Sequence, residues 1–171
     1  MNVRVPMARR ILDPRYGNNL VDAHFLDAFE GTEQEAVERI LALYRQRKFT
    51  LVLPYSVKAE IEHENTPEHV KTRARELIFT EPVELTQPEL ELVERSRDLM
   101  RGNAAPGKHD ADAFHVVEAA KYGGRHFITN DKRILSKKAE ISELAGIDVV
   151  TPTEFLERYD SFDSQQRGGD L

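Results

Sequence analysis

The sequence has no cysteine, no long apolar run and no excess of basic residues, and each absence excludes a class of protein. Without cysteine there can be no disulfide, no thiolate metal site and no cysteine nucleophile. No unbroken apolar stretch approaches the roughly 20 residues that span a bilayer, and the N-terminal MNVRVPMARRIL lacks the apolar segment of a secretory signal. We therefore expect a soluble, cytoplasmic protein without a membrane partner.

The charge balance is acidic: 30 acidic and 24 basic residues give a net charge of −6. This argues against a protein that coats nucleic acid through bulk positive charge. It is compatible with an enzyme that cuts nucleic acid, because some carboxylates would then be metal ligands while basic residues gather on one face. Lys132 and Arg133 beside Asp131 could form such a basic cluster, although charges of this kind are commonly only solvated surface groups.

The 171 residues are enough for one domain with a single core. Residues 1–18 would be an N-terminal extension, 19–158 the domain, and 159–171 a polar, disordered tail. Within the domain, short apolar runs alternate with helical patterns. Strands are expected around residues 20–21 and at 49–54, 126–129 and 147–150; helices are expected at 32–48, 55–64, 68–79, 87–100, 110–122 and 151–159, with a loop at 101–109.

This alternation predicts a doubly wound α/β sandwich with a central, mostly parallel sheet of about four or five strands flanked by helices. Ligands of such sheets bind outside the carboxyl ends of the strands. Asp22 closes the first strand, and Asp131 follows the strand at 126–129. Glu60 lies in the opening turns of the helix after the second strand, and Asp112 lies in the first turn of the helix at 110–122. Topology thus directs acids from four distant segments to one edge.

Each of these acids also has an ordinary structural interpretation. Asp110 fits a helix N-cap, and Asp112 and Glu60 could complement helix dipoles, by ~0.5 kcal/mol each. Asp22 and Asp131 could be turn residues at strand ends. Together, however, four carboxylates in one cleft would repel one another and raise each other's pKa values unless a cation were bound. The combined pattern therefore favours a metal site.

Four segments between residues 19 and 157 share a family pattern: LVDAHFL, LPYSVKAEI, DADAFHVVEAAKYGGRHFITNDKRIL and VVTPTEFLE. The third is the most specific, because Gly123 stands eleven positions after Asp112, and Asp131 directly follows Thr129 and Asn130. Together the segments resemble the PIN-domain nucleases, a family that includes the toxin ribonucleases of bacterial toxin–antitoxin pairs. The similarity covers most of the chain.

The resemblance implies an endoribonuclease that hydrolyses phosphodiester bonds to a 5′-phosphate and a 3′-hydroxyl. It implies RNA as substrate, and a protein antitoxin and a homodimeric partner as associations that the family often has. The catalytic and metal-binding acids would be Asp22, Glu60, Asp112 and Asp131, with Asp110 as a competitor of Asp112 that the spacing to Gly123 disfavours. The residues that contact these acids or the substrate would be Ser56, Thr129, Asn130, His24, Lys132 and Arg133.

Carboxylates without cysteine suit hard, oxygen-preferring cations, so Mg²⁺ or Mn²⁺ is the expected cofactor. Such an ion can lower the pKa of bound water and neutralise the scissile phosphate. The six histidines include no His-Glu-x-x-His pattern, which leaves little support for a zinc site. His115, three residues after Asp112, could line the cleft, but a lone histidine on a helix is commonly structural.

Two other functions fit parts of the pattern. A phosphoryl-transfer protein of the receiver or haloacid-dehalogenase type would need two closely spaced acids after the first strand, where this chain has Asp22-Ala23-His24. The stronger alternative is a catalytically inactive PIN fold that binds RNA or a protein. It stays open because His24 stands where many PIN domains have Asn or Ser.

Overall fold

The central sheet has five parallel strands in the order β3-β2-β1-β4-β5. The computed structural model describes residues 11–101 and 110–168. Most of the expected N-terminal extension, residues 102–109 of the expected loop and the last three residues of the expected tail lie outside these ranges. The strands are β1 (Asn18–Val21), β2 (Thr50–Leu53), β3 (Ile78–Phe79), β4 (Gly124–Ile128) and β5 (Asp148–Val150).

Helices follow the strands, so the predicted doubly wound α/β class is confirmed. They are α1 (Ala23–Leu26), α2 (Gly31–Arg45), the 3₁₀ turn η1 (Tyr55–Val57), α3 (Lys58–Glu62), α4 (Glu68–Ala74), α5 (Gln87–Arg101), α6 (Asp110–Lys121), α7 (Lys132–Ser136), α8 (Lys138–Ala145) and α9 (Pro152–Gly168). No helix in the described ranges is long and apolar enough to cross a membrane.

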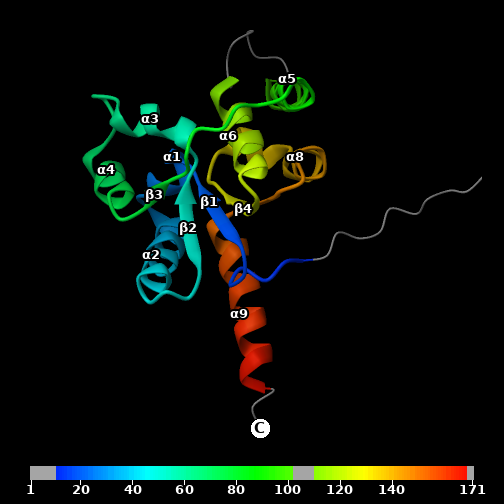
Figure 1. Ribbon diagram of the computed structural model, residues 1–171. Coiled ribbons are helices and arrows are strands. Elements are labelled where there is room, and N and C mark those ends of the chain that lie inside the picture. The colour runs from blue at the N-terminus through cyan, green and yellow to red at the C-terminus, as the bar shows by residue number, and fades with distance from the viewer. Residues whose placement is uncertain (1–10, 102–109, 169–171) are drawn as a thin grey trace, which may run out of the picture.

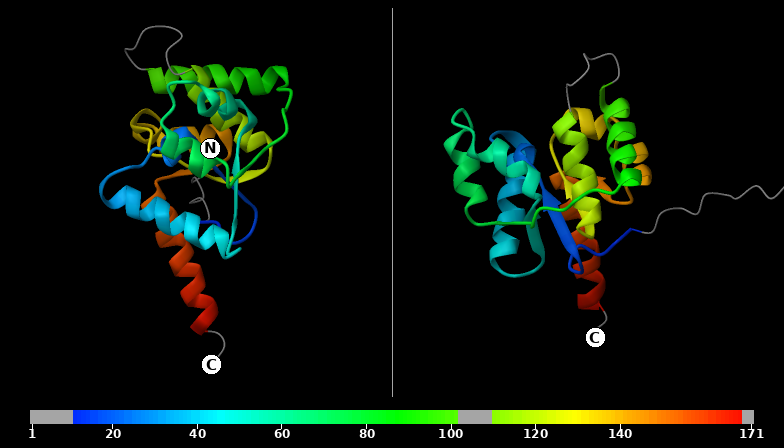
Figure 2. Two further views of the ribbon diagram at one scale, coloured as in Figure 1. Left: turned by 90° about the vertical axis from the view of Figure 1, so that its left-hand side faces the viewer. Right: turned by 45° about the horizontal axis from the view of Figure 1, so that its top comes forward.

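Both faces of the sheet are covered. Figure 1 and the right view of Figure 2 show α2 and α4 on one side of the strands and α5, α6 and α8 on the other. Side chains of successive strand residues point to opposite faces, and in β1 Leu20 packs into the core beneath α6 while Val21 packs into the core beneath α2. Phe127 and Ile128 of β4 divide in the same way. Burial on both faces explains why the strands read as continuous apolar runs.

The prediction of a helix at 68–79 is wrong for its last residues. Helix α4 ends at Ala74, and Ile78 and Phe79 instead form the edge strand β3, which pairs with β2. The Thr80 backbone N–H continues this pairing with a 2.7 Å hydrogen bond to the Leu53 carbonyl. Pairing with β2 thus overrides the local helical pattern, as tertiary context often does for short segments.

The prediction of a disordered tail at 159–171 is wrong for residues 159–168. Helix α9 continues to Gly168 and projects beyond the sheet (Figure 1). Tyr159 is buried in the core on the α2 side. Asp160 accepts two hydrogen bonds from the Arg39 guanidinium of α2, at 2.6 and 2.8 Å. These contacts with a distant helix order a segment whose own composition is polar.

Candidate metal centre

The acids predicted to converge are positioned by four separate elements at the carboxyl edge of the sheet. Asp22 follows β1 and Asp131 follows β4. Glu60 lies in α3 after β2, and Asp112 lies in the first turn of α6. Two groups of potential ligand atoms result, each with all atoms within 4.8 Å of one another: one from His24, Asp112 and Asp131, the other from Glu60, Asp112 and His115. Asp112 belongs to both groups, so it stands at the centre of the site.

Asp131 connects β4 to α7 and is buried. Its Oδ1 caps α7 by accepting a 2.8 Å hydrogen bond from the Arg133 backbone N–H, and its own N–H donates to Thr129 Oγ1 at 3.0 Å. Its Oδ2 lies 3.2 Å from Nε2 of His24, whose side chain is half exposed. The capping contacts therefore hold one carboxylate oxygen and leave the other facing His24.

Asp22 lies behind these groups rather than within them. It is 2% exposed, caps α1 by accepting a 2.9 Å bond from the Phe25 N–H, and accepts a 2.6 Å bond from Thr129 Oγ1. Burial raises the pKa of Asp22 to about 6, although these hydrogen bonds and His24 favour the charged form. Thr129, which is predicted to support the acids, connects Asp22 to Asp131. Its hydroxyl donates to the Asp22 carboxylate and accepts from the Asp131 backbone N–H.

The opposite side of the centre is a chain of hydrogen-bonded side chains. His115 Nε2 lies 2.8 Å from Glu60 Oε1, and Nδ1 lies 2.5 Å from Ser56 Oγ. The Ser56 backbone N–H in turn donates to the buried Glu118 carboxylate at 3.2 Å. The hydrogen bond from His115 lowers the pKa of Glu60.

Sequence reasoning favoured a structural role for His115 and did not consider Glu118. A signal was present, because Asp112, His115 and Glu118 follow one another at intervals of three along α6, and residues three apart on a helix are neighbours on its surface. Ser56, by contrast, is predicted to support the acids, and its hydroxyl lies 2.5 Å from Nδ1 of the imidazole.

The charges of the centre act on one another. Burial and the neighbouring Asp131 raise the pKa of Asp112. Burial alone would favour the neutral imidazole of His24, but Asp22, Asp131 and Asp112 raise its pKa above the usual value. The shift of His24, and the part of the Asp112 shift that Asp131 causes, indicate a negative potential that a bound cation would relieve.

Four further candidates from the sequence are Lys132, Arg133, Asn130 and Asp110. Lys132 and Arg133 are exposed in the first turn of α7, directly after Asp131. The Asn130 side-chain nitrogen is buried without a hydrogen-bond partner among the described residues. Asp110 begins α6, but its side chain lies outside the described part of the chain.

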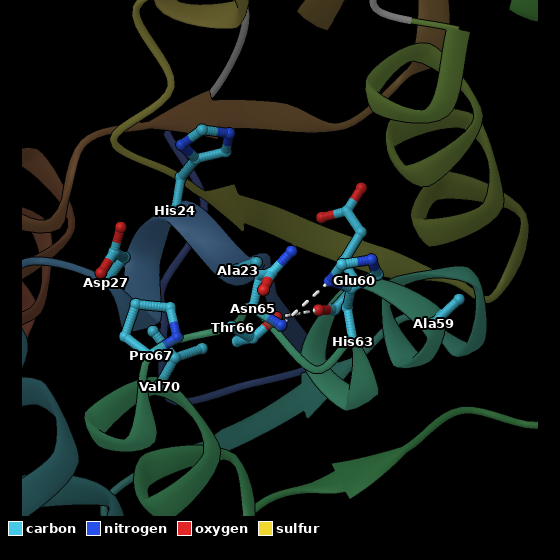
Figure 3. A pocket seen from close by; sticks show the side chains of 10 residues that line it. All are labelled: Ala23, His24, Asp27, Ala59, Glu60, His63, Asn65, Thr66, Pro67 and Val70. Atoms are coloured by element: carbon cyan, nitrogen blue, oxygen red, sulfur yellow. Dashed lines mark hydrogen bonds between the residues drawn. The ribbon is translucent and has the colours of Figure 1, made fainter.

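A hollow of about 500 Å³ adjoins the acids between α1, α3 and α4. His24 and Glu60 belong to both the hollow and the candidate centre. In Figure 3 the His24 ring and the Glu60 carboxylate point to the same side, away from Pro67 and Val70. The rest of the wall is formed by Ala23, Asp27, Ala59, His63, Asn65 and Thr66.

No protein-family model matches the chain, and no curated protein is significantly similar to it. Function must therefore be inferred from the fold and from the geometry of this edge. The acidic and histidine side chains could bind a metal ion, since each group combines carboxylate oxygens with one imidazole nitrogen. Divalent cations are bound by such donors in proteins.

Proposed function

We propose that the chain is a PIN-like, metal-dependent endoribonuclease that uses Mg²⁺ or Mn²⁺. The observation that supports this most strongly is the position of Asp112, which is shared by two groups of ligand atoms from distant segments at the carboxyl edge of a parallel sheet. Ligands of doubly wound folds bind at this edge. The sequence resemblance to PIN-domain nucleases agrees with the same residues.

Asp112, Asp131 and Glu60 would hold the ion, with Asp22 behind them. Bound there, a divalent ion supplies an activated water and neutralises charge on the phosphate. The Asp131 cap and the Asp22–Thr129 hydrogen bond fix the carboxylates before substrate arrives. Such preorganisation is where much of the catalytic effect of an enzyme arises.

Groups at the rim would handle the substrate. The exposed cations Lys132 and Arg133 would bind phosphate oxygens beside the centre. His24, whose side chain is half exposed beside Asp131, would donate a proton from Nε2 to the leaving oxygen when its imidazole is protonated. The hollow beside His24 and Glu60 offers apolar and amide surface to an unpaired nucleotide, which supports single-stranded or looped RNA as the substrate.

The decisive experiment incubates the purified chain with a pool of single-stranded and structured RNAs, in Mn²⁺ or in EDTA. We expect cleavage only in Mn²⁺, with 5′-phosphate products. If RNA stays intact while Mn²⁺ still raises the melting temperature, the metal site stands and the proposed activity on these RNAs fails. Absence of both effects would contradict the metal-dependent mechanism as a whole.

A non-cutting module that binds RNA or a protein is the second candidate function. The contacts of His24 with Asp131 and of His115 with Glu60 favour it, because each of these acids already has a side-chain partner without an ion. In that case the chain would bind RNA equally well in EDTA. A protein that covered the hollow, as an antitoxin would, would compete with RNA whether or not the chain cuts it.

Filling the hollow tests the substrate path separately from the metal. Ala59 is exposed on α3 and lines the hollow. We expect Ala59→Trp to lower kcat/KM for RNA about tenfold or more, because a stacked base contributes about 1–3 kcal/mol that the new ring would displace. Mn²⁺ binding should not change. Ala139→Trp, at an exposed position on α8 that does not line the hollow, is the matched control; equal loss in both variants would argue against this path.

A further inference from the structure

His115 occupies an unusual position for a histidine on a core helix. It is 3% exposed, yet both ring nitrogens have polar neighbours: Ser56 Oγ at 2.5 Å from Nδ1 and Glu60 Oε1 at 2.8 Å from Nε2. His115 also belongs with Glu60 and Asp112 to a group whose potential ligand atoms all lie within 4.8 Å of one another. An ordinary ion pair needs one carboxylate, whereas this imidazole lies close to two.

Ser56 is compatible with either tautomer of this imidazole. A serine hydroxyl can donate or accept, so it satisfies Nδ1 whether or not that nitrogen carries a proton. In the contact observed here Nε2–H donates to the Glu60 carboxylate; beside a bound cation, Nδ1–H would donate to Ser56 Oγ and the lone pair of Nε2 would face the ion. This is the arrangement of a metal-ligating histidine, in which a hydrogen bond at one nitrogen orients the other.

The position of Ser56 is itself fixed. Its backbone N–H donates to the carboxylate of Glu118, which is 2% exposed and lies one turn after His115 on α6. The 3₁₀ turn η1 and helix α6 are thereby held together at the point where the hydroxyl meets the imidazole. Ser56 and Glu118 thus fix the orientation of an imidazole that lies close to two acids.

We propose that His115 is a nitrogen ligand of the metal centre, oriented by Ser56, and that the centre therefore prefers Mn²⁺ and other transition-metal ions over Mg²⁺. This rests on the proposed metal-dependent function. Imidazole nitrogen suits transition metals, whereas Mg²⁺ strongly favours oxygen ligands and retained water. The expectation of an all-oxygen site would then be replaced by a mixed one.

Electron spin echo spectroscopy of protein-bound Mn²⁺ tests the ligand directly, because a coordinated nitrogen gives a ¹⁴N modulation. His24 is first replaced by Asn, so that it cannot supply the signal. We expect ¹⁴N modulation in His24→Asn, its replacement by ¹⁵N coupling when histidine is ¹⁵N-labelled, and its loss in His24→Asn with His115→Asn. The labelled sample keeps His115 unchanged, so this measurement still tests for a histidine ligand if the double variant does not fold.

The support from Ser56 has its own readout. We expect Ser56→Ala to weaken Mn²⁺ binding about 10- to 100-fold, the range seen when an outer partner of a metal-binding histidine is removed, with a smaller effect on Mg²⁺. Ser161→Ala, exposed on α9, is the control. Mn²⁺ binding without nitrogen coupling, or an unchanged ratio of Mn²⁺ to Mg²⁺ affinity in Ser56→Ala, would overturn the inference and leave the nuclease proposal intact. No Mn²⁺ binding by the unaltered chain would overturn both.

Discussion

Replacing Asp112 with Asn is expected to lower RNA cleavage about 10³-fold, because the metal supplies several kcal/mol of transition-state stabilisation and each 1.4 kcal/mol is about tenfold. Asp112 is the carboxylate common to both groups of ligand atoms, so its loss removes a donor from each. In the unaltered chain, Mn²⁺ at a hundredfold excess over its Kd should stabilise the folded state by about 2.7 kcal/mol and so raise the melting temperature. The same change should abolish this rise.

Two measurements check this expectation: single-turnover cleavage of RNA and thermal unfolding with and without Mn²⁺. Asparagine preserves the size of the side chain, and burial and Asp131 raise the pKa of Asp112, so the variant should fold at least as well as the original without metal. Asp163→Asn, on α9 where Asp163 pairs with Arg167, is the matched control and should behave like the unaltered chain. Undiminished cleavage by Asp112→Asn would remove the centre of the proposal.

Asp22→Asn is expected to stabilise the metal-free protein at neutral pH while reducing its activity. Burial raises the pKa of Asp22 from 3.8 to about 6. Between these values the folded state binds more protons than the unfolded state, so the contribution of this group to stability falls as pH rises through the window. Above pH 6 the buried, ionised carboxylate costs about 1–3 kcal/mol, since one pKa unit corresponds to 1.36 kcal/mol.

The neutral amide avoids this cost and can keep the cap, because its oxygen can still accept the bond from the Phe25 N–H. Its NH2 group takes the place of Asp22 Oδ2, so it would donate to Thr129 Oγ1 instead of accepting from it. In EDTA at pH 8 the variant should therefore melt several degrees higher than the original, and the difference should vanish near pH 4. With Mn²⁺ the gap should narrow, since a cation favours the ionised carboxylate. Asp22→Ala separates the cap from the charge: losing the cap costs about 0.5–2 kcal/mol. A lower melting temperature for Asp22→Asn at pH 8 would contradict this account of the burial.

The carboxyl-edge position of the acids was predictable because it depends only on chain direction. In a parallel sheet every strand ends at the same edge, so residues that follow strands, such as Asp22 and Asp131, must lie there. The start of α6, which leads back to β4, must lie there too. Hydrophobic periodicity was sufficient for this step, since both faces of the sheet are buried and the strands read as apolar runs.

Two local predictions failed where distant partners decide the conformation. Ile78 and Phe79 have a helical pattern, but β2 offers unpaired backbone groups that pair with them in β3. The polar residues after Tyr159 have little apolar surface to bury, and the hydrogen bonds between Arg39 and Asp160 help to order them as a helix. Neither partner can be identified from the neighbouring sequence.

The sequence by itself determined the α/β class and the edge of the sheet at which the acids lie, because these follow from strand direction and hydrophobic pattern. Only the tertiary structure decided how those acids divide: Asp112 at the centre, Asp22 behind it in a buried cap, and His115 between Ser56 and Glu60. The physical reason is that ligand geometry depends on side-chain distances of a few ångströms between segments far apart in the chain. Periodicity places an element, but packing sets where each atom lies within it.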